Sequence, residues 1–203
     1  MAIVDDGRLV EYNIQMASRE PITGNIYKGV VMKVERCLQA AFVNYGGKKD
    51  GFLPLRDVSP DYFSERGDGG NGGQSRSSLK VGQEILVQVL REVSERKGAL
   101  LTSYISLPGR YLVLMPKKAG GGISRKIEDR QERDRLKRIA DRIRPIGLGL
   151  IVRTEAEGKA EKDLRNDLDF LLRMWDQIQA KVKVTNAPGI VHQDLSLVYR
   201  TLR

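Results

Sequence analysis

The chain has 203 residues, of which 40% are hydrophobic, so it can bury a core in one domain of moderate size or in two small ones. Its 35 lysine and arginine residues outnumber the 26 acidic residues, and the resulting net charge of +9 favours a polyanion as partner. The single cysteine, Cys37, excludes an internal disulfide framework and a multi-cysteine zinc site. We expect this cysteine to be reduced and partly buried.

No apolar run approaches the ~18 residues that a membrane-spanning helix needs. The N-terminal sequence MAIVDDGRLVEYNI lacks the basic-then-apolar order of a signal peptide. We therefore expect a cytoplasmic protein of bacterial type with no membrane span.

The first half of the chain predicts short strands. Residues 1–20 alternate as one or two strands, and residues 24–55 contain three alternating runs broken by glycine and lysine. Residues 83–89 alternate again. Between these runs, residues 64–78 (SERGDGGNGGQSRSS) are too poor in apolar side chains to stay ordered, so we interpret them as a flexible loop rather than a domain boundary.

Two aromatic residues depart from this alternation. Over residues 41–45 it places the small and aliphatic side chains and Tyr45 on one face, which leaves Phe42 pointing outward. Phe52 points outward in the same way beside Leu53. Outward rings on a basic protein predict a platform on which bases stack, worth roughly 1–3 kcal/mol per base. The alternative is that both rings lie in a second core, and the pattern alone leaves the two open.

The second half predicts two helices and further strands. Residues 110–115 form a continuous apolar strand that we expect to be covered on both faces, and residues 149–154 form another strand. Residues 128–144 form an amphipathic helix that ends at Pro145. A longer helix covers residues 159–183, in which we expect Trp175 to be packing. After a turn, residues 190–194 and 197–202 return as strands. This order predicts an α+β fold, with an α+β layer into which residues 24–103 are inserted.

Several segments, in this order and at these spacings, resemble the ribonuclease E/G family. They are AAFVNYG, LTSYISLPGRYLVLMP, GGGISRKI, GLGLIVRTEAEGK and IVHQDLSLVYRTLR. The resemblance implies a five-stranded OB-fold β-barrel that binds RNA at residues 24–103, inserted into a partial ribonuclease-H-like scaffold. It assigns the first scaffold strands to residues 1–23, a 5′-sensor subdomain to residues 104–189, and return strands, cut short at Arg203, to residues 190–203.

The same resemblance implies two groups of binding residues. Phe42 and Phe52 match the family's RNA-stacking aromatics and Lys97 its phosphate-contacting lysine, with Tyr27, Lys28 and Tyr45 as neighbours. A 5′-monophosphate needs a guanidinium fork, a hydroxyl donor and backbone N–H groups at one place. The resemblance assigns this role to Arg125, Arg153 and Thr154, and contact with the terminal nucleotide to Gly109 and Val113.

We expect no catalytic and no metal-binding residue in this chain. Asp163, Asp167 and Asp169 lie on a helix rich in lysine and arginine, where solvent-facing charge pairs are the ordinary interpretation. His192, the only histidine, lies in an apolar strand and is expected to be structural. In the family, Mg²⁺ binds to paired aspartates downstream, and Zn²⁺ is shared by cysteines of two subunits, which implies homo-oligomers of the full-length enzyme. Both parts would lie beyond Arg203.

The expected function is therefore binding of single-stranded RNA with a 5′-monophosphate, as the N-terminal part of a ribonuclease E/G-type endoribonuclease. Without converging carboxylates to hold Mg²⁺, the chain alone is expected to be inactive as a nuclease. The alternative is a stand-alone, non-catalytic RNA-binding protein. A general binder of polyanions is a third, weaker interpretation.

Overall fold

A computed structural model describes residues 2–5, 8–12, 22–63, 79–92 and 97–194. The flexible loop expected at residues 64–78 and the strands expected after residue 194 lie outside this part of the chain. At the N-terminus, β1 (Ala2–Asp5) and β2 (Arg8–Tyr12) pair as an antiparallel hairpin, which confirms the strands expected there.

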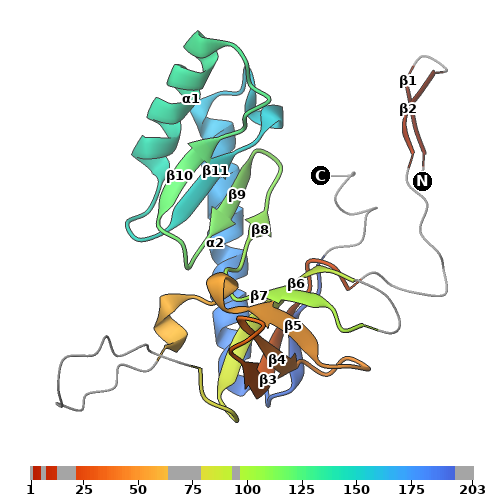
Figure 1. Cartoon of the computed structure of the whole chain (residues 1–203). Coiled ribbons are helices and arrows are strands. Elements are labelled where there is room, and N and C mark those ends of the chain that lie inside the picture. The colour runs from red at the N-terminus through yellow and green to blue at the C-terminus, as the bar shows by residue number, and fades with distance from the viewer. Residues whose placement is uncertain (1, 6–7, 13–21, 64–78, 93–96, 195–203) are drawn as a thin grey trace.

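Five strands form a closed barrel in the lower part of Figure 1. They are β3 (Ile26–Glu35), β4 (Ala40–Asn44), β5 (Gly51–Pro54), β6 (Glu84–Arg91) and β7 (Leu100–Thr102). The hydrogen-bonded order is β3-β4-β5-β7-β6, and pairing of β3 with β6 closes the ring. A sixth strand, β12 (Gly189–His192), pairs antiparallel with the first residues of β3, Ile26 to Lys28. The closed five-stranded arrangement is the one expected of an OB-like barrel.

Alternation between a buried and a more exposed face is clearest in β5 and in the second half of β4, where Val43 and Leu53 have no exposed surface and their neighbours are partly exposed. Strand β6 does not alternate as expected, because residues 85–89 are all buried between the barrel interior and the second unit. Short helices η1 (Leu55–Asp57) and η2 (Pro60–Tyr62) follow β5.

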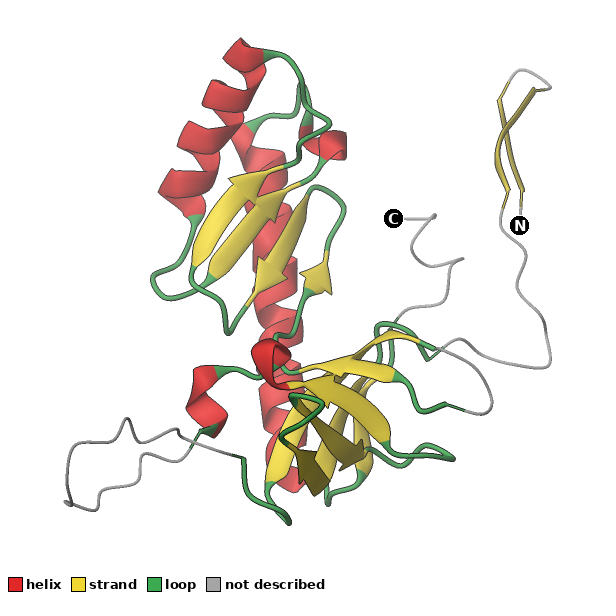
Figure 2. Ribbon diagram, in the orientation of Figure 1, coloured by secondary structure: helices red, strands yellow, loops and turns green. Residues whose placement is uncertain are grey.

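The second unit is a four-stranded sheet with two long helices, shown in the upper part of Figure 2. Its strands are β8 (Leu107–Pro108), β9 (Leu112–Met115), β10 (Gly120–Ile123) and β11 (Gly149–Val152), in the order β10-β11-β9-β8. The helices are α1 (Arg130–Ile143) and α2 (Glu161–Val184), and a short helix η3 (Thr154–Ala156) follows β11. The chain is therefore α+β, as expected.

Both predicted helices are confirmed, and their ends have local causes. The carboxylate of Asp129 accepts the backbone N–H groups of Gln131 and Glu132 at 3.1 and 3.3 Å, which caps the start of α1. Pro145 follows the last turn. Helix α2 packs against β9 and also reaches β12 on the barrel. Trp175 is 8% exposed and belongs to the hydrophobic core, as expected.

One hydrophobic core joins the two units. It contains Leu112, Leu136 and Leu168 from the sheet and helices, together with Ile26 and Leu86 from the barrel. The barrel interior forms a second cluster around Val31 and Leu101.

Two sequence expectations were wrong. Cys37 is exposed rather than partly buried, because it lies in the turn between β3 and β4, outside the barrel wall. The strand expected at residues 110–115 begins only at Leu112 and is not covered on both faces, since its side chains alternate between buried and half-buried. Arg110 and Tyr111 donate their backbone N–H groups to the carboxylate of Asp167 on α2.

Candidate RNA interface and phosphate site

The outer face of the barrel presents a pair of aromatic rings. Phe42 on β4 and Phe52 on β5 are direct partners in the strand register. Their ring centroids lie 5.9 Å apart at an interplanar angle of 74°. Both side chains are half-buried, and neither belongs to the two hydrophobic clusters found in the described part of the chain. The alternation therefore places the rings off the core, and a second core around them is not observed.

The backbone next to Lys97 lies beside the start of β5. The backbone N–H of Phe52 donates to the carbonyl of Ala99 at 2.8 Å. A Cβ atom on Gly98 would lie 1.8 Å from the carbonyl oxygen of Asp50, so only glycine permits this close approach. Lys97 itself is exposed. An exposed lysine thus belongs to a segment that lies against the strand carrying Phe52.

The three remaining candidates of the barrel differ in their surroundings. Tyr45 is 5% exposed and packs in the barrel core, with its ring 5.1 Å from that of Tyr27. Tyr27 is half-buried. Lys28 donates to the carbonyl of Thr185 at 3.1 Å and pairs with Glu84 at 2.8 Å. These contacts make Lys28 a link between the barrel and the end of α2, and make Tyr45 a support for Tyr27.

The topology of the second sheet brings the predicted phosphate-binding residues to one edge. Strands β10 and β11 are parallel and end together, because Ile123 pairs with Val152. Strand β9 is antiparallel to β11 and starts at that edge. Beyond it lie Arg125 after β10, Arg153 and Thr154 after β11, and Gly109 before β9. We call these four residues the phosphate edge.

Hydrogen bonds fix Arg153 within the phosphate edge. Its backbone N–H donates to the carbonyl of Tyr111 at 2.8 Å, and one guanidinium nitrogen donates to the carbonyl of Gly109 at 2.6 Å. Arg125 is exposed and forms no ion pair with any residue that the structure describes. Val113, the fifth candidate, lies one step inside the sheet opposite Ile151 and is half-buried.

A carboxylate already occupies part of the phosphate edge. Glu155 accepts a hydrogen bond from the second guanidinium nitrogen of Arg153 at 3.3 Å. Its other oxygen accepts from the hydroxyl of Thr154, also at 3.3 Å. Glu155 is about half exposed, with 48% of its side-chain surface accessible. It therefore satisfies, from the protein itself, the two side chains that the sequence assigns to a phosphate.

The segment that starts β9 is held by Asp167 of α2. One carboxylate oxygen accepts the N–H of Arg110 at 3.1 Å, and the other accepts those of Tyr111 and Leu112 at 2.9 and 3.0 Å. A Cβ atom on Gly109 would lie 2.4 Å from the same carboxylate. Asp167 is only 8% exposed. Asp167 thus positions the segment to which Arg153 is anchored.

The expectation of a solvent-facing Asp167 was wrong, and the helical period explains why. Asp167 lies three residues after Leu164 and four before Leu171, on the buried face of α2. An aspartate on the apolar stripe of a helix is a pattern that could have predicted a buried carboxylate with hydrogen-bond partners. By contrast, Asp163 caps α2 by accepting the N–H of Ala160 at 3.2 Å, and Asp169 is exposed.

Among the described residues, no three histidine, cysteine, aspartate or glutamate side chains lie close enough to hold a metal ion. Burial, together with the positive charge of Lys181, lowers the pKa of His192. This half-buried imidazole is neutral at neutral pH, which suits a structural residue of β12.

Models of two known protein families match successive parts of the chain. A model of the S1 RNA-binding domain matches residues 20–102, and a model of the ribonuclease E/G family matches residues 106–203. The chain belongs to the ribonuclease E/G family. It is 39% identical to ribonuclease E of Escherichia coli (strain K12) and 42% identical to ribonuclease E of Haemophilus influenzae. It is 37% identical to ribonuclease G of Escherichia coli (strain K12).

All three matches cover 100% of the chain but only 19%, 22% and 42% of these relatives, respectively. As the matches to ribonucleases E and G extend over the whole chain, a stand-alone RNA-binding protein outside this family is not favoured. None of the helices in the described part of the chain combines the length and the apolar character that crossing a membrane requires.

Proposed function

We propose that this ribonuclease E/G-family chain binds single-stranded RNA on its barrel and senses the 5′-monophosphate of that RNA at the phosphate edge. The whole enzyme to which such a chain contributes would cleave RNA in processing and decay, with its metal-dependent chemistry, and any homo-oligomer contacts, supplied outside these residues. The cytoplasm is the compartment that this role requires.

The observation on which the proposal rests most heavily is the meeting of Gly109, Arg125, Arg153 and Thr154 at one sheet edge. They come from three different segments of the chain. Two guanidinium groups and a hydroxyl at one place form a set that suits the several oxygens of a terminal phosphate. The contacts of Glu155 support the proposal, because its carboxylate accepts hydrogen bonds from the Arg153 guanidinium and the Thr154 hydroxyl, the groups assigned to a phosphate.

The barrel supplies affinity that does not depend on the RNA end. Exposed rings stack on any base, since every base has an aromatic face. Phe42 and Phe52 form the platform, Tyr27 extends it with Tyr45 behind, and Lys97 neutralises a phosphate. The barrel therefore binds an RNA strand whether its 5′ end carries a phosphate or a hydroxyl. Only the phosphate edge distinguishes the two ends.

Matched oligomers test the two roles separately. Fluorescence anisotropy with one single-stranded sequence, bearing either a 5′-phosphate or a 5′-hydroxyl, should show tighter binding of the phosphorylated form by about 1.5–3 kcal/mol. Arg153→Ala should remove that preference and keep hydroxyl binding. Phe52→Ala should weaken both oligomers equally, by roughly 1–3 kcal/mol.

Two control variants match these changes. Arg173→Ala removes an exposed arginine from α2, and Leu38→Ala removes an apolar side chain that is 58% exposed, in the turn between β3 and β4. Neither should alter binding. Equal affinity of the unmutated chain for the two oligomers would exclude phosphate sensing and leave a general RNA-binding surface.

A further inference from the structure

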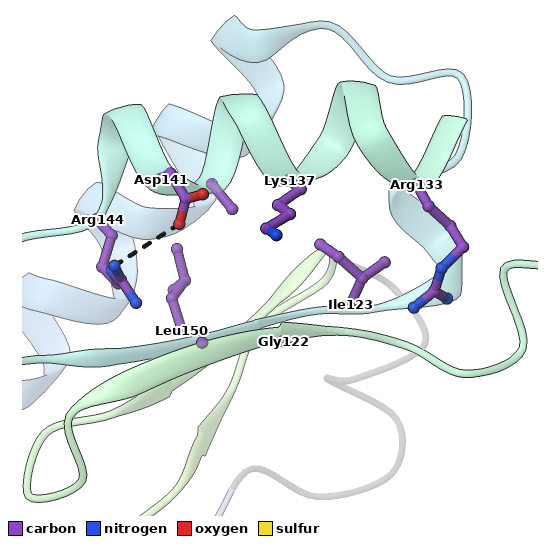
Figure 3. Close-up of a pocket in the computed structure, with 9 residues that line it drawn as sticks. Gly122, Ile123, Arg133, Lys137, Asp141, Arg144 and Leu150 are labelled. Carbon is purple, nitrogen blue, oxygen red and sulfur yellow. Dashed lines mark ion pairs between the residues drawn. The ribbon is translucent and has the colours of Figure 1, made fainter. Parts of the chain in front are cut away.

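A cavity of about 280 Å³ lies between helix α1 and strand β10, apart from both surfaces described above (Figure 3). Its apolar floor consists of Ile123, Ala140 and Leu150. The strand side of the cavity is formed by Gly121 and Gly122, which expose backbone instead of side chains. None of the four residues of the phosphate edge lines it. We call this cavity the α1–β10 groove.

Three basic residues surround the groove, two from α1 and Arg144 directly after its last residue. Arg133 donates to the carbonyls of Ser124 and Ile127 at 2.7 and 2.9 Å, which holds its guanidinium at one end. Arg144 lies at the other end, 3.6 Å from Asp141, the one carboxylate of the lining. Between them, Figure 3 shows the amino group of Lys137 directed into the space between helix and strand.

Lys137 has no ion-pair partner among the residues that the structure describes. Lys137 lies four residues after Arg133, where like charges repel, and four residues before Asp141, whose carboxylate pairs with Arg144. The lining therefore carries three cations and one carboxylate around its apolar floor. An anionic ligand would balance this excess of positive charge.

Strand β10 adds hydrogen-bonding groups to the groove. It is the outermost strand of its sheet and pairs only with β11 among the described strands, so one side of its backbone is unpaired. A Cβ atom on Gly121 would lie 2.9 Å from the carbonyl oxygen of Leu150 and 3.2 Å from the guanidinium of Arg144. Glycine at this position therefore lets Arg144 lie close against the strand.

We propose that the α1–β10 groove binds one nucleotide of RNA, with its phosphate against Lys137 and its base over the apolar floor. The volume of about 280 Å³ lies just below the ~300–1,000 Å³ typical of small-molecule sites, which suits a single flipped-out nucleotide and excludes a duplex. The end at Arg133 adjoins Ser124, the residue before Arg125. The groove therefore continues the RNA surface beyond the phosphate edge, and this inference rests on the proposed function because it takes RNA as the ligand.

A pair of neighbouring substitutions tests the groove. Lys137→Gln removes the unpartnered cation, and Arg138→Gln removes an exposed cation from the next position of the same helix. In anisotropy titrations over a series of salt concentrations, Lys137→Gln should weaken binding about threefold to tenfold at low salt and reduce the log–log salt slope by about 0.7. It should do so for both the 5′-phosphate and the 5′-hydroxyl oligomer. Arg138→Gln should leave affinity and slope unchanged.

NMR distinguishes a nucleotide within an RNA strand from a free nucleotide as the ligand of the groove. Uridine monophosphate and a short oligomer are each titrated into the labelled chain, and the backbone amide signals of Gly121 and Gly122 are followed. Shifts with the oligomer alone assign the groove to an RNA strand, whereas equal shifts with the monophosphate assign it to free nucleotides.

Unmoved amide signals with both ligands, together with equal behaviour of the Lys137 and Arg138 variants, would overturn the proposal. The outcome is separable from that of the phosphate edge. If the 5′-phosphate preference is absent but Lys137→Gln still weakens binding, the sensing function fails and the groove stands.

Discussion

From the three hydrogen bonds that Asp167 accepts, we predict how far the substitution Asp167→Asn lowers the free energy of unfolding. The asparagine side chain has the same shape but keeps a single acceptor oxygen and no charge. If that oxygen takes the position that now serves Tyr111 and Leu112, two neutral bonds remain and the new NH₂ group faces the N–H of Arg110. One charge-assisted bond is lost and two are weakened.

A hydrogen bond to a charged group contributes about 1.5–3 kcal/mol and a neutral one about 0.5–1.5 kcal/mol. The lost bond and the two weakened ones together predict a destabilisation of about 3.5–6 kcal/mol. This is a large part of the stability of a typical domain, which is about 5–15 kcal/mol. With a urea dependence of about 2 kcal/mol per molar, the middle of the usual range, the unfolding midpoint should fall by about 2–3 M.

Asp169→Asn provides the matched control, because Asp169 lies two residues along the same helix and is exposed. The assay is urea unfolding followed by circular dichroism, together with binding of the two matched oligomers. Asp167→Asn should lower the midpoint and, under native conditions, reduce the preference for a 5′-phosphate, since Gly109 anchors Arg153. If the two variants unfold at the same urea concentration and both retain the preference, our account of Asp167 is wrong.

Two further predictions concern carboxylates near the phosphate edge. Glu155→Ala frees the side chains of Arg153 and Thr154, so it should tighten binding of the 5′-phosphate oligomer several-fold in anisotropy titrations. Binding of the 5′-hydroxyl oligomer should not change. Unchanged binding of the phosphate oligomer would show that Glu155 does not compete with the ligand. The side-chain hydrogen bonds from Arg135 lower the pKa of Glu132 to about 2, so the folded state gains stability from the ionised form above an unfolded-state pKa of about 4.3 and loses it as the pH falls towards 2. After allowance for solvent screening, Glu132→Gln should lower the free energy of unfolding in urea by about 1 kcal/mol at pH 6 and by almost nothing at pH 2. The control Glu157→Gln changes an exposed residue and should leave the free energy of unfolding unchanged at both pH values.

Local patterns in the sequence were sufficient to predict the individual elements. Alternation over residues 41–45 predicted that Phe42 faces away from Ala41 and Val43, because successive side chains of a strand point to opposite faces wherever the strand lies. It left open whether a second core covers that face, and among the described residues the structure shows none. The 3.6-residue period likewise defined both long helices and the packing of Trp175. Family resemblance then supplied candidate roles for residues that pattern alone leaves as surface charges, Arg125 and Arg153 among them.

Only the tertiary structure decided which distant residues meet. The phosphate edge exists because β10 and β11 are parallel and end together, a pairing between segments about thirty residues apart that no local pattern specifies. Burying a carboxylate is costly unless it has hydrogen-bond partners, so the sequence favoured an exposed Asp167. Its partners lie at residues 110–112, more than fifty positions earlier in the chain, and no local pattern reveals them. The α1–β10 groove depends in the same way on the approach of a helix to an edge strand, since Lys137 is an ordinary exposed lysine until the floor beneath it is in place.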